Sequence, residues 1–282
     1  MAAPRQWETC VGLIDLHCHI LPSIDDGAPD LATSLAMARL AVADGIAVTA
    51  CTPHILPGVY NNSGAAIGIA VARLREALAE ADIPLRLVAG ADVHVAPDLV
   101  AQLGAGHALT INGSRYLLLE PPHHVLPPRL EDHLFHLQTA GYVPILTHPE
   151  RLSWVDAHYR LVKRLVYNGV LMQLTAGSFL GRFGRRPRYW AERMLNEGLC
   201  HVLATDAHNI DQRAPQLAET RELIARRIGA AEADNLVLTR PRAIIENVNA
   251  AELPSLPQPA PQAAAPSSWR RIFGRGRAGG AT

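Results

Sequence analysis

IDLHCHILPSIDDG, at residues 14–27, is the stretch that decides the fold class of this sequence. An apolar run at residues 11–16 predicts a β-strand, and the polar residues start where that run ends. Alternate residues of a strand point to the same side, so His17 and His19 can bind one ion while Cys18 points away. The stretch therefore predicts a metal site at the end of a strand.

Six further apolar runs predict strands, and amphipathic segments that predict helices lie between them. Strands recur roughly every 30 residues, which is the length of one strand–helix unit. Seven such units favour a parallel α/β barrel, and an open doubly wound sheet is the alternative with the same periodicity. The predicted strands are Val11–Leu16, Ile46–Cys51, Leu85–Ala89, Arg115–Leu119, Val143–Thr147, Val170–Leu174 and His201–Ala204, and the predicted helices are Leu31–Ala43, Ile67–Ala81, Arg129–Ala140, His158–Tyr167 and Arg188–Glu197.

Six of the seven predicted strands end in a His or a carboxylate. In a parallel α/β barrel these ends converge on one face, and imidazole nitrogens with carboxylate oxygens suit divalent ions. We therefore expect a metal cluster formed by His17, His19, His54, Asp92, Glu120, His148, Asp206 and His208. The other histidines are not assigned as ligands: we interpret His94 as lining the pocket, His123 and His124 as part of a Pro-rich turn, and His107, His133, His136, His158 and His201 as surface or helix residues.

Two arginines follow metal-type motifs closely enough to bind an anion. Arg151 comes one turn after His148, and Arg213 follows His208. A guanidinium matches the geometry of a phosphate group, so both are candidate catalytic and substrate-binding residues. The Arg-rich segment 181–188 follows the sixth strand, and it either attracts an anionic substrate or is a solvated loop.

Other classes of phosphate enzyme are excluded by missing residues. No Arg stands six positions after any of the four cysteines, as a cysteine-based phosphatase requires. The single lysine, Lys163, is not in a P-loop motif. No GxSxG nucleophile motif is present either.

The motifs together resemble the PHP (polymerase and histidinol phosphatase) superfamily. Within it, the sequence is most similar to the bacterial tyrosine phosphatases of capsule and exopolysaccharide synthesis. The resemblance implies a distorted (β/α)7 barrel, TIM-barrel-like, with up to three divalent ions, most often Mn²⁺ and alternatively Fe²⁺ or Zn²⁺. The matching segments, in family order, are IDLHCHILPSIDDG, CTPH at 51–54, GADVHV at 90–95, SRYLLLE at 114–120, THPER at 147–151 and ATDAHN at 204–209.

The resemblance also implies a distribution of ligands and a role for two arginines. Arg151 and Arg213 match the phosphate-binding arginines of the family. One departure is Asp92, where the family usually has a longer Glu that bridges two ions. The implied ligand sets are His17, His19, Asp92 and Asp206 for one ion, Asp92, Glu120 and His148 for a second, and His54, His208 and either Asp25 or Asp26 for a third.

The expected activity is hydrolysis of a phosphomonoester by a metal-activated water, without a covalent enzyme intermediate. The resemblance implies phosphotyrosine on a bacterial tyrosine autokinase as the substrate. Alternatives are a small phosphate such as histidinol phosphate, a nucleic-acid phosphodiester, or, in a different class, a non-catalytic regulatory binding module.

The charge distribution predicts no nucleic-acid binding in the main body of the chain. The last 30 residues contain four Arg and no acid, so the remainder carries 22 basic and 26 acidic residues. Residues 1–250 are predicted to form the phosphatase domain. Residues 251–282 are predicted to be a disordered Pro/Ala-rich linker and basic tail that could contact a membrane surface or an acidic partner. The scattered cysteines and the lack of a signal peptide or long apolar run predict a cytoplasmic protein without a transmembrane segment. The sequence does not indicate the oligomeric state.

Overall fold

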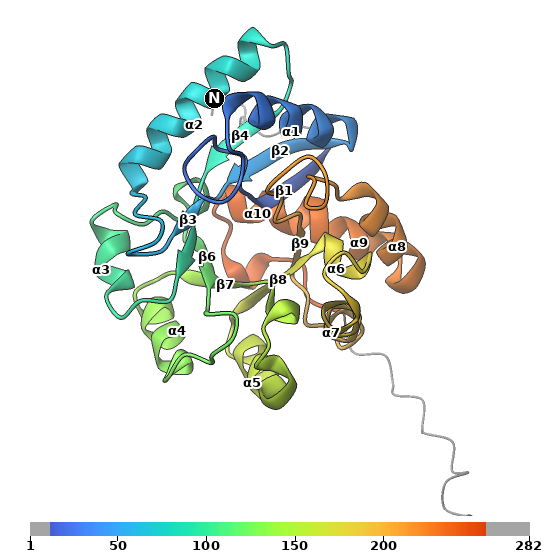
Figure 1. Ribbon diagram of the computed structural model, residues 1–282. Coiled ribbons are helices and arrows are strands. Elements are labelled where there is room, and N and C mark those ends of the chain that lie inside the picture. The colour runs from blue at the N-terminus through green and yellow to red at the C-terminus, as the bar shows by residue number, and fades with distance from the viewer. Residues whose placement is uncertain (1–11, 258–282) are drawn as a thin grey trace, which may run out of the picture.

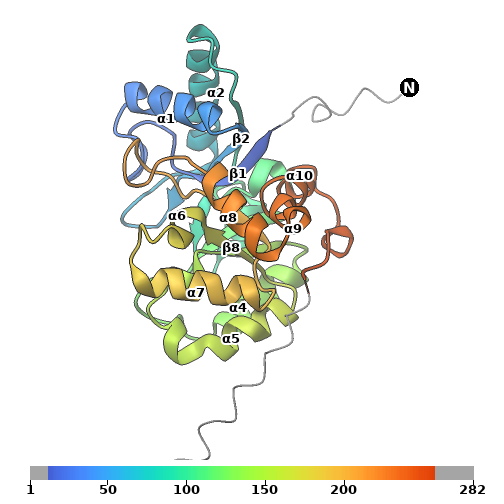
Figure 2. The same cartoon turned by 90° about the vertical axis from the view of Figure 1, so that its right-hand side faces the viewer.

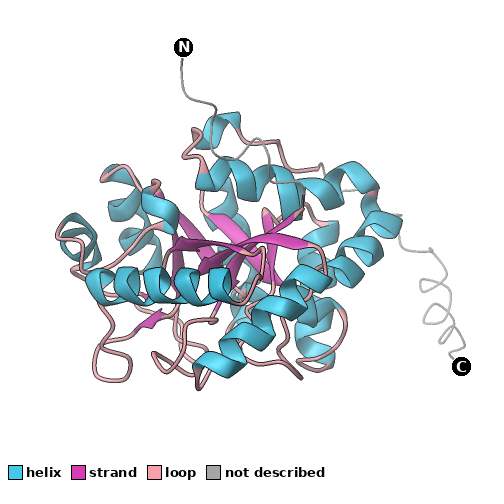
Figure 3. Cartoon of the chain, turned by 90° about the horizontal axis from the view of Figure 1, so that it is seen from above, coloured by secondary structure: helices cyan, strands magenta, loops and turns pink. Residues whose placement is uncertain are grey.

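The computed structural model describes residues 12–257. Cys10 and the predicted basic tail from residue 258 onward lie outside this range. Parallel strands lie at the centre of the molecule and helices surround them, as the view from above shows (Figure 3). Within residues 12–257, no helix combines the length and the apolar composition that crossing a bilayer requires.

All seven predicted strands are present, and two of them continue into a short second strand. One sheet has the order β1-β2-β4 and the other the order β3-β5-β6-β7-β8-β9, and all pairs are parallel (Figure 1). The chain passes from β2 to β3 and from β4 to β5 within a few residues, so the two sheets follow each other around the barrel. The strands are β1 Leu13–Cys18, β2 Ile46–Cys51, β3 His54–Ile55, β4 Arg86–Ala89, β5 Asp92–His94, β6 Tyr116–Glu120, β7 Val143–Thr147, β8 Leu171–Thr175 and β9 Val202–Ala204.

The barrel is closed by hydrogen bonds between the first strand and the segment that follows the last strand. Asp206 N donates to His17 O over 2.8 Å, and His19 N donates to Ala207 O over 2.8 Å. An open doubly wound sheet would leave the first and last strands apart. The predicted (β/α)7 barrel is therefore confirmed, and its seam lies beside the HxH and DxH motifs.

A small apolar core fills the barrel interior. All seven strand units contribute to it, for example Tyr116 and Leu118 from β6, while Leu117 and Leu119 on the opposite face pack in the larger outer core. This alternation follows from the two-residue period of a strand. Glu120, next in the inward-facing series after Leu118, therefore points into the mouth of the barrel.

Helix α10, Arg240–Ile245, closes the opposite end. Its Ile244 and Ile245 belong to the inner core. Arg240 is fully buried and donates to the carbonyl oxygens of Pro254 and Ser255, which holds the segment after the helix against the barrel. The candidate ligand groups lie at the other end, where β6 and its neighbours terminate.

The five predicted helices are present, with differences at their beginnings. Asp30 caps the first helix by accepting from Thr33 N over 2.8 Å, and this helix has the predicted bounds. Three others begin three residues earlier than predicted. The short helices α3 and α6 were not predicted, nor were α8 to α10, which lie together in Figure 2. The helices are α1 Leu31–Ala43, α2 Gly64–Glu80, α3 Leu99–Gly104, α4 Leu130–Thr139, α5 Val155–Tyr167, α6 Ala176–Phe179, α7 Arg185–Asn196, α8 Ala218–Ile228, α9 Ala230–Asp234 and α10.

One histidine lies in a different environment from the one predicted. His201 is not a surface or helix residue: it is buried at the start of the last strand unit, where its Nδ1 accepts a hydrogen bond from Met172 N. Burial lowers the pKa of His201 to about 3, and the nearby charge of Arg240 acts in the same direction.

Candidate metal centre

The structure brings nine of the ten predicted ligand residues together at one end of the barrel. Their nitrogen and oxygen atoms form overlapping groups, and within each group the candidate ligand atoms lie within 4.8 Å of one another. Apart from Asp26 and the partly buried His54, these nine residues are buried. The nine are His17, His19, Asp26, His54, Asp92, Glu120, His148, Asp206 and His208.

The first group forms at the barrel seam. The Nε2 atoms of His17 and His19 lie 3.1 Å apart, and each lies 3.5 Å from Asp206 Oδ1. Asp92 Oδ2 lies 3.4 Å from His17 Nε2. The group matches the first ligand set implied by the family resemblance. Gln173, which sequence reasoning missed, accepts from His17 Nδ1 over 2.9 Å and leaves Nε2 facing the group.

The second group separates the roles of the two adjacent aspartates. Asp26 Oδ1 lies 3.5 Å from His54 Nε2 and 3.4 Å from His208 Nε2. Asp25 instead accepts from His19 Nδ1 over 2.7 Å and from two backbone amides. The geometry therefore makes Asp26 the candidate ligand and Asp25 the residue that orients His19, which belongs to both groups.

The third region is centred on Glu120 and departs from the implied ligand set. Glu120 Oε1 lies 3.3 Å from His148 Nε2, as expected, but also 3.2 Å from His123 Nε2. Glu120 Oε2 lies 3.2 Å from His54 Nδ1 and 2.5 Å from His94 Nε2. His123 and His94 therefore belong to this region, although the sequence was interpreted as placing His123 in a turn and His94 in the pocket lining, with His94 as an alternative ligand where Asp92 does not bridge.

Two site residues have left-handed backbone conformations that non-glycine residues rarely adopt. His148 has φ 35° and Asp206 has φ 51°. Such conformations cost of order 1–3 kcal/mol each and persist where surrounding structure enforces them. Both residues stand immediately after a strand region and turn their side chains into the cluster. This strain marks the strand ends as functional positions.

Charge in the site is unevenly distributed. Burial alone lowers the pKa of His17, but Asp92 and Asp206 outweigh it and raise that pKa to about 9. Burial lowers the pKa of His19 to about 4, helped by His208, and the pKa of His148 to about 4, helped by Arg151. The pKa of Asp206 lies well below its usual value despite its burial, because His17 and the two arginines are close. The Asp206 carboxylate thus remains charged and attracts cations.

Buried polar atoms without partners provide a direct test of whether these residues fit metal ions. Such atoms are costly unless they contact a ligand. Among residues 12–257, about half of the buried side-chain nitrogen and oxygen atoms that have no hydrogen-bond partner belong to this site. They are both carboxylate oxygens of Asp92, Glu120 Oε2, His54 Nδ1, His148 Nδ1 and His208 Nε2. This donor set, nitrogen and oxygen without thiolate, fits divalent cations.

Arg151 and Arg213 lie at the edge of the cluster and share one partner. Both guanidinium groups contact Asp206 Oδ2, with Arg213 Nη2 at 2.7 Å. The ring of Phe183, another residue that sequence reasoning missed, lies 4.4 Å from the Arg151 guanidinium and 5.9 Å from that of Arg213. Two forked donors next to candidate ligands can bind the oxygens of a phosphoryl group.

The Arg-rich segment 181–188 is partly used for structure. Arg182 donates to Gln216, Arg186 to Asp156 and to Leu152 O, and Arg188 to Glu192. These contacts anchor the segment and so position Phe183 over the two site arginines. Arg186 also approaches the backbone oxygen of Arg151, at 3.5 Å.

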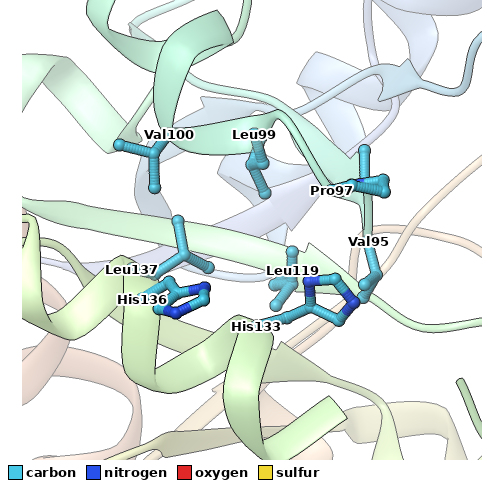
Figure 4. Close-up of a pocket in the computed structure, with 9 residues that line it drawn as sticks. Val95, Pro97, Leu99, Val100, Leu119, His133, His136 and Leu137 are labelled. Atoms are coloured by element: carbon cyan, nitrogen blue, oxygen red, sulfur yellow. The ribbon is translucent and has the colours of Figure 1, made fainter. Parts of the chain in front are cut away.

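A separate pocket lies between α3 and α4, away from the cluster (Figure 4). Apolar side chains and the imidazoles of His133 and His136 line it, without a carboxylate. It contains none of the predicted site residues, so it is not the candidate centre.

Known proteins resemble this chain along most of its length. The family described as capsular polysaccharide synthesis, CpsB/CapC, matches residues 13–246. The chain is 36% identical to the tyrosine-protein phosphatase YwqE of Bacillus subtilis over 218 residues, which cover 77% of this chain and 86% of that protein. It is 28% identical to the tyrosine-protein phosphatase CpsB of Streptococcus pneumoniae over 242 residues, which cover 83% of this chain and 98% of that protein.

Solved structures agree with the sequence relatives. One, from work on YwqE from Bacillus subtilis and CpsB from Streptococcus pneumoniae, described as unique metal-dependent tyrosine phosphatases, matches with a TM-score of 0.81 and 33% identity, covering 88% of this chain and 100% of that one. A dihydropyrimidinase from Brevibacillus agri shares the fold alone, with a TM-score of 0.51, 11% identity, and coverage of 84% of this chain and 71% of that one. The family resemblance inferred from the motifs is confirmed.

Proposed function

Because the chain belongs to the capsular polysaccharide synthesis CpsB/CapC family, we propose that it is a metal-dependent tyrosine-protein phosphatase. The observation that carries the proposal is the juxtaposition at Asp206. Its Oδ1 faces His17 and His19, while its Oδ2 contacts Arg151 and Arg213. One carboxylate therefore links candidate metal ligands to candidate phosphate-binding groups.

The proposed ligands form sets that the geometry supports. His17, His19, Asp92 and Asp206 would hold one ion, and Asp26, His54 and His208 another, with His19 between them. Glu120 and His148 would hold a third. When bound, divalent ions activate water for attack on phosphorus and offset negative charge on the phosphoryl oxygens.

The arginines would bind and orient the phosphoryl group. Their guanidinium groups donate in a fixed fork, so two of them at the edge of the site can fix a phosphate ester in one orientation. They also stabilise charge that increases on the oxygens in the transition state. Phe183 restricts the positions of both arginines by lying against them.

Cysteine chemistry is not expected to contribute. Cys18, Cys51 and Cys200 are buried, and burial raises the pKa of each thiol, to about 12 for Cys51. A neutral buried thiol is a poor nucleophile. All three are free thiols. Because thiols stay reduced in the cytoplasm, a cytoplasmic location is part of this proposal.

The finer parts of the proposal are the metal and the substrate. We propose Mn²⁺, with Fe²⁺ or Zn²⁺ as alternatives that the same ligands accept. We propose phosphotyrosine on a bacterial tyrosine autokinase that controls capsule or exopolysaccharide synthesis, supported by the names of the family and of its relatives. A histidinol-phosphate-like metabolite is the competing substrate.

The test is hydrolysis of a phosphotyrosine peptide by the purified full chain. EDTA should abolish turnover, Mn²⁺ should restore it, and iodoacetamide should leave it unchanged. His17→Ala should reduce both metal content and turnover. Full turnover in EDTA would contradict the metal-dependent mechanism. Stronger turnover of histidinol phosphate would contradict the substrate, and metal binding without any hydrolysis would favour a regulatory module.

A further inference from the structure

Glu120 has an unusual number of imidazole neighbours. Its Oε1 atom lies 3.2 Å from His123 Nε2 and 3.3 Å from His148 Nε2. Its Oε2 atom lies 2.5 Å from His94 Nε2 and 3.2 Å from His54 Nδ1. Each oxygen of this single buried carboxylate therefore faces two ring nitrogens that come from different strand ends or loops.

Hydrogen bonding alone does not account for this arrangement. Glu120 Oε2 and His54 Nδ1 are buried and have no hydrogen-bond partner among residues 12–257, although both lie within contact distance of each other. His94 Nε2 also approaches Oε2 as an ion-pair contact without forming a hydrogen bond of standard geometry. On the other side, His123 Nε2 is within hydrogen-bond distance of Glu120 Oε1, at 3.2 Å. The unpartnered nitrogen and oxygen atoms on the Oε2 side are the types of donor that suit a divalent cation.

Among the described residues, no group of candidate ligands contains both Asp92 and Glu120. The Asp92 carboxylate lies with His17 and His19, and its Oδ2 is 3.6 Å from His54 Nδ1. The groups that surround Glu120 are instead His54 with His94 on one side, and His123 with His148 on the other. An ion beside Glu120 and His148 therefore needs a further ligand, and His123 is in position to supply it.

The sequence explains how both histidines reach Glu120. His94 lies in β5 and pairs with Glu120 of the neighbouring strand β6. His123 follows Glu120 by three residues, across Pro121 and Pro122, and its ring lies 4.9 Å from that of His148. Their neighbour His124 is exposed and does not contact Glu120.

We propose that Glu120 bridges two ion positions with its two oxygens, and that His94 and His123 are metal ligands, His94 on the Oε2 side and His123 on the Oε1 side. This inference rests on the proposed metal-dependent function and assigns to it two residues outside the implied ligand sets. A carboxylate can bridge ions about 3.5–4 Å apart.

The experiment measures metal rather than activity. Full-length wild type, His94→Gln and His123→Gln are equilibrated with Mn²⁺, the bound metal is counted by mass spectrometry, and affinity is measured by titration with a competing chelator. Each variant should lose about one ion per chain or bind its weakest ion at least about tenfold less tightly. His124→Gln is the matched control and should behave as wild type.

A crystal of the wild type soaked in Mn²⁺ gives a second readout that does not depend on the folding of variants. Anomalous peaks should lie about 2.0–2.3 Å from His94 Nε2 and His123 Nε2. Two results would overturn this inference and leave the proposed function standing, provided that the wild type is metal-dependent. In one, the anomalous peaks lie beyond about 3 Å from both nitrogen atoms. In the other, the variants retain all ions at unchanged affinity. Wild type that binds no metal overturns both.

Discussion

The Nδ1 atom of His17 and the Oε1 atom of Gln173 lie 2.9 Å apart, although 156 residues separate them in the chain. An amide oxygen only accepts, so Nδ1 carries a proton, and loss of a proton from the ring therefore frees the lone pair of Nε2. The Nε2 atom faces His19 and Asp206. A residue on β8 thus fixes the tautomer of a candidate ligand on β1.

Replacement of Gln173 by Leu should weaken metal binding without removing a ligand. The loss of a partner that orients a metal-binding His typically costs about 10- to 100-fold in affinity. Calorimetric titration with Mn²⁺ measures the change in affinity. The control is Gln102→Leu, because Gln102 is partly exposed and its side-chain amide donates a hydrogen bond to Asp98. Equal Mn²⁺ affinity in wild type and Gln173→Leu would show that the hydrogen bond is dispensable.

Arg151→Lys and Arg213→Lys should each reduce kcat/KM for a phosphotyrosine peptide. A Lys retains the charge but loses the planar fork, and removal of one donor to a developing oxyanion costs about 100- to 1000-fold in kcat. Since the Lys variants keep part of the interaction, we expect the lower end of that range. Steady-state kinetics test this, with the exposed Arg185→Lys as control; losses under threefold in both site variants would argue against the assigned role.

Phe183→Leu should have a smaller effect that appears mainly in KM. The ring lies 4.4 Å from the Arg151 guanidinium, and a cation–π contact of this type contributes about 0.5–1 kcal/mol. That corresponds to a change of about two- to fivefold. Phe183→Tyr keeps an aromatic face and should retain the wild-type KM, whereas identical KM values in the Leu and Tyr variants would exclude the aromatic contribution.

Arg240→Leu should destabilise the fold strongly. Arg240 is fully buried and pairs with Glu232 over 2.8 Å. Removal of one partner of a buried ion pair costs about 3–5 kcal/mol because the other charge is left uncompensated. Arg221→Leu, which breaks a half-exposed pair with Asp234, should cost at most about 1 kcal/mol. Urea unfolding compares the two, and similar free-energy losses would contradict the burial argument.

His201 should make the protein less stable in mild acid. Its pKa falls from 6.5 to about 3 on folding, so below pH 6.5 the unfolded chain binds a proton that the folded chain does not. The free energy of unfolding should therefore decrease by about 1.4 kcal/mol per pH unit below pH 6.5 from this residue alone.

The variant His201→Gln should lack this component, since Gln does not titrate. Urea unfolding at pH 7 and pH 5 should show a loss about 2 kcal/mol larger in wild type than in the variant. The exposed His136→Gln should lose as much stability as wild type does. The same pH dependence in wild type and His201→Gln would mean that His201 is accessible to protons in the folded state.

Local pattern was sufficient for most of the secondary structure. The Asp30 cap and the Asp44-Gly45 end define α1, and both signals act within a few residues. Helix α7 begins three residues before the predicted Arg188 and includes Pro187, which is tolerated in the first turn of a helix. The helices after β9 were missed because their apolar residues pack against one another and against the barrel end, which only the folded chain defines.

The sequence by itself determined the class of site. Two pairs of residues stand at strand ends two positions apart, His17 with His19 and Asp206 with His208. This spacing points both side chains of a pair to the same side, and parallel strands bring such ends to one face. Only the tertiary structure decided which atoms meet. Asp26 rather than Asp25 faces His54 and His208, and His94 and His123 converge on Glu120. Strand register and the turn at each strand end set those contacts, and both depend on packing between segments far apart in the chain.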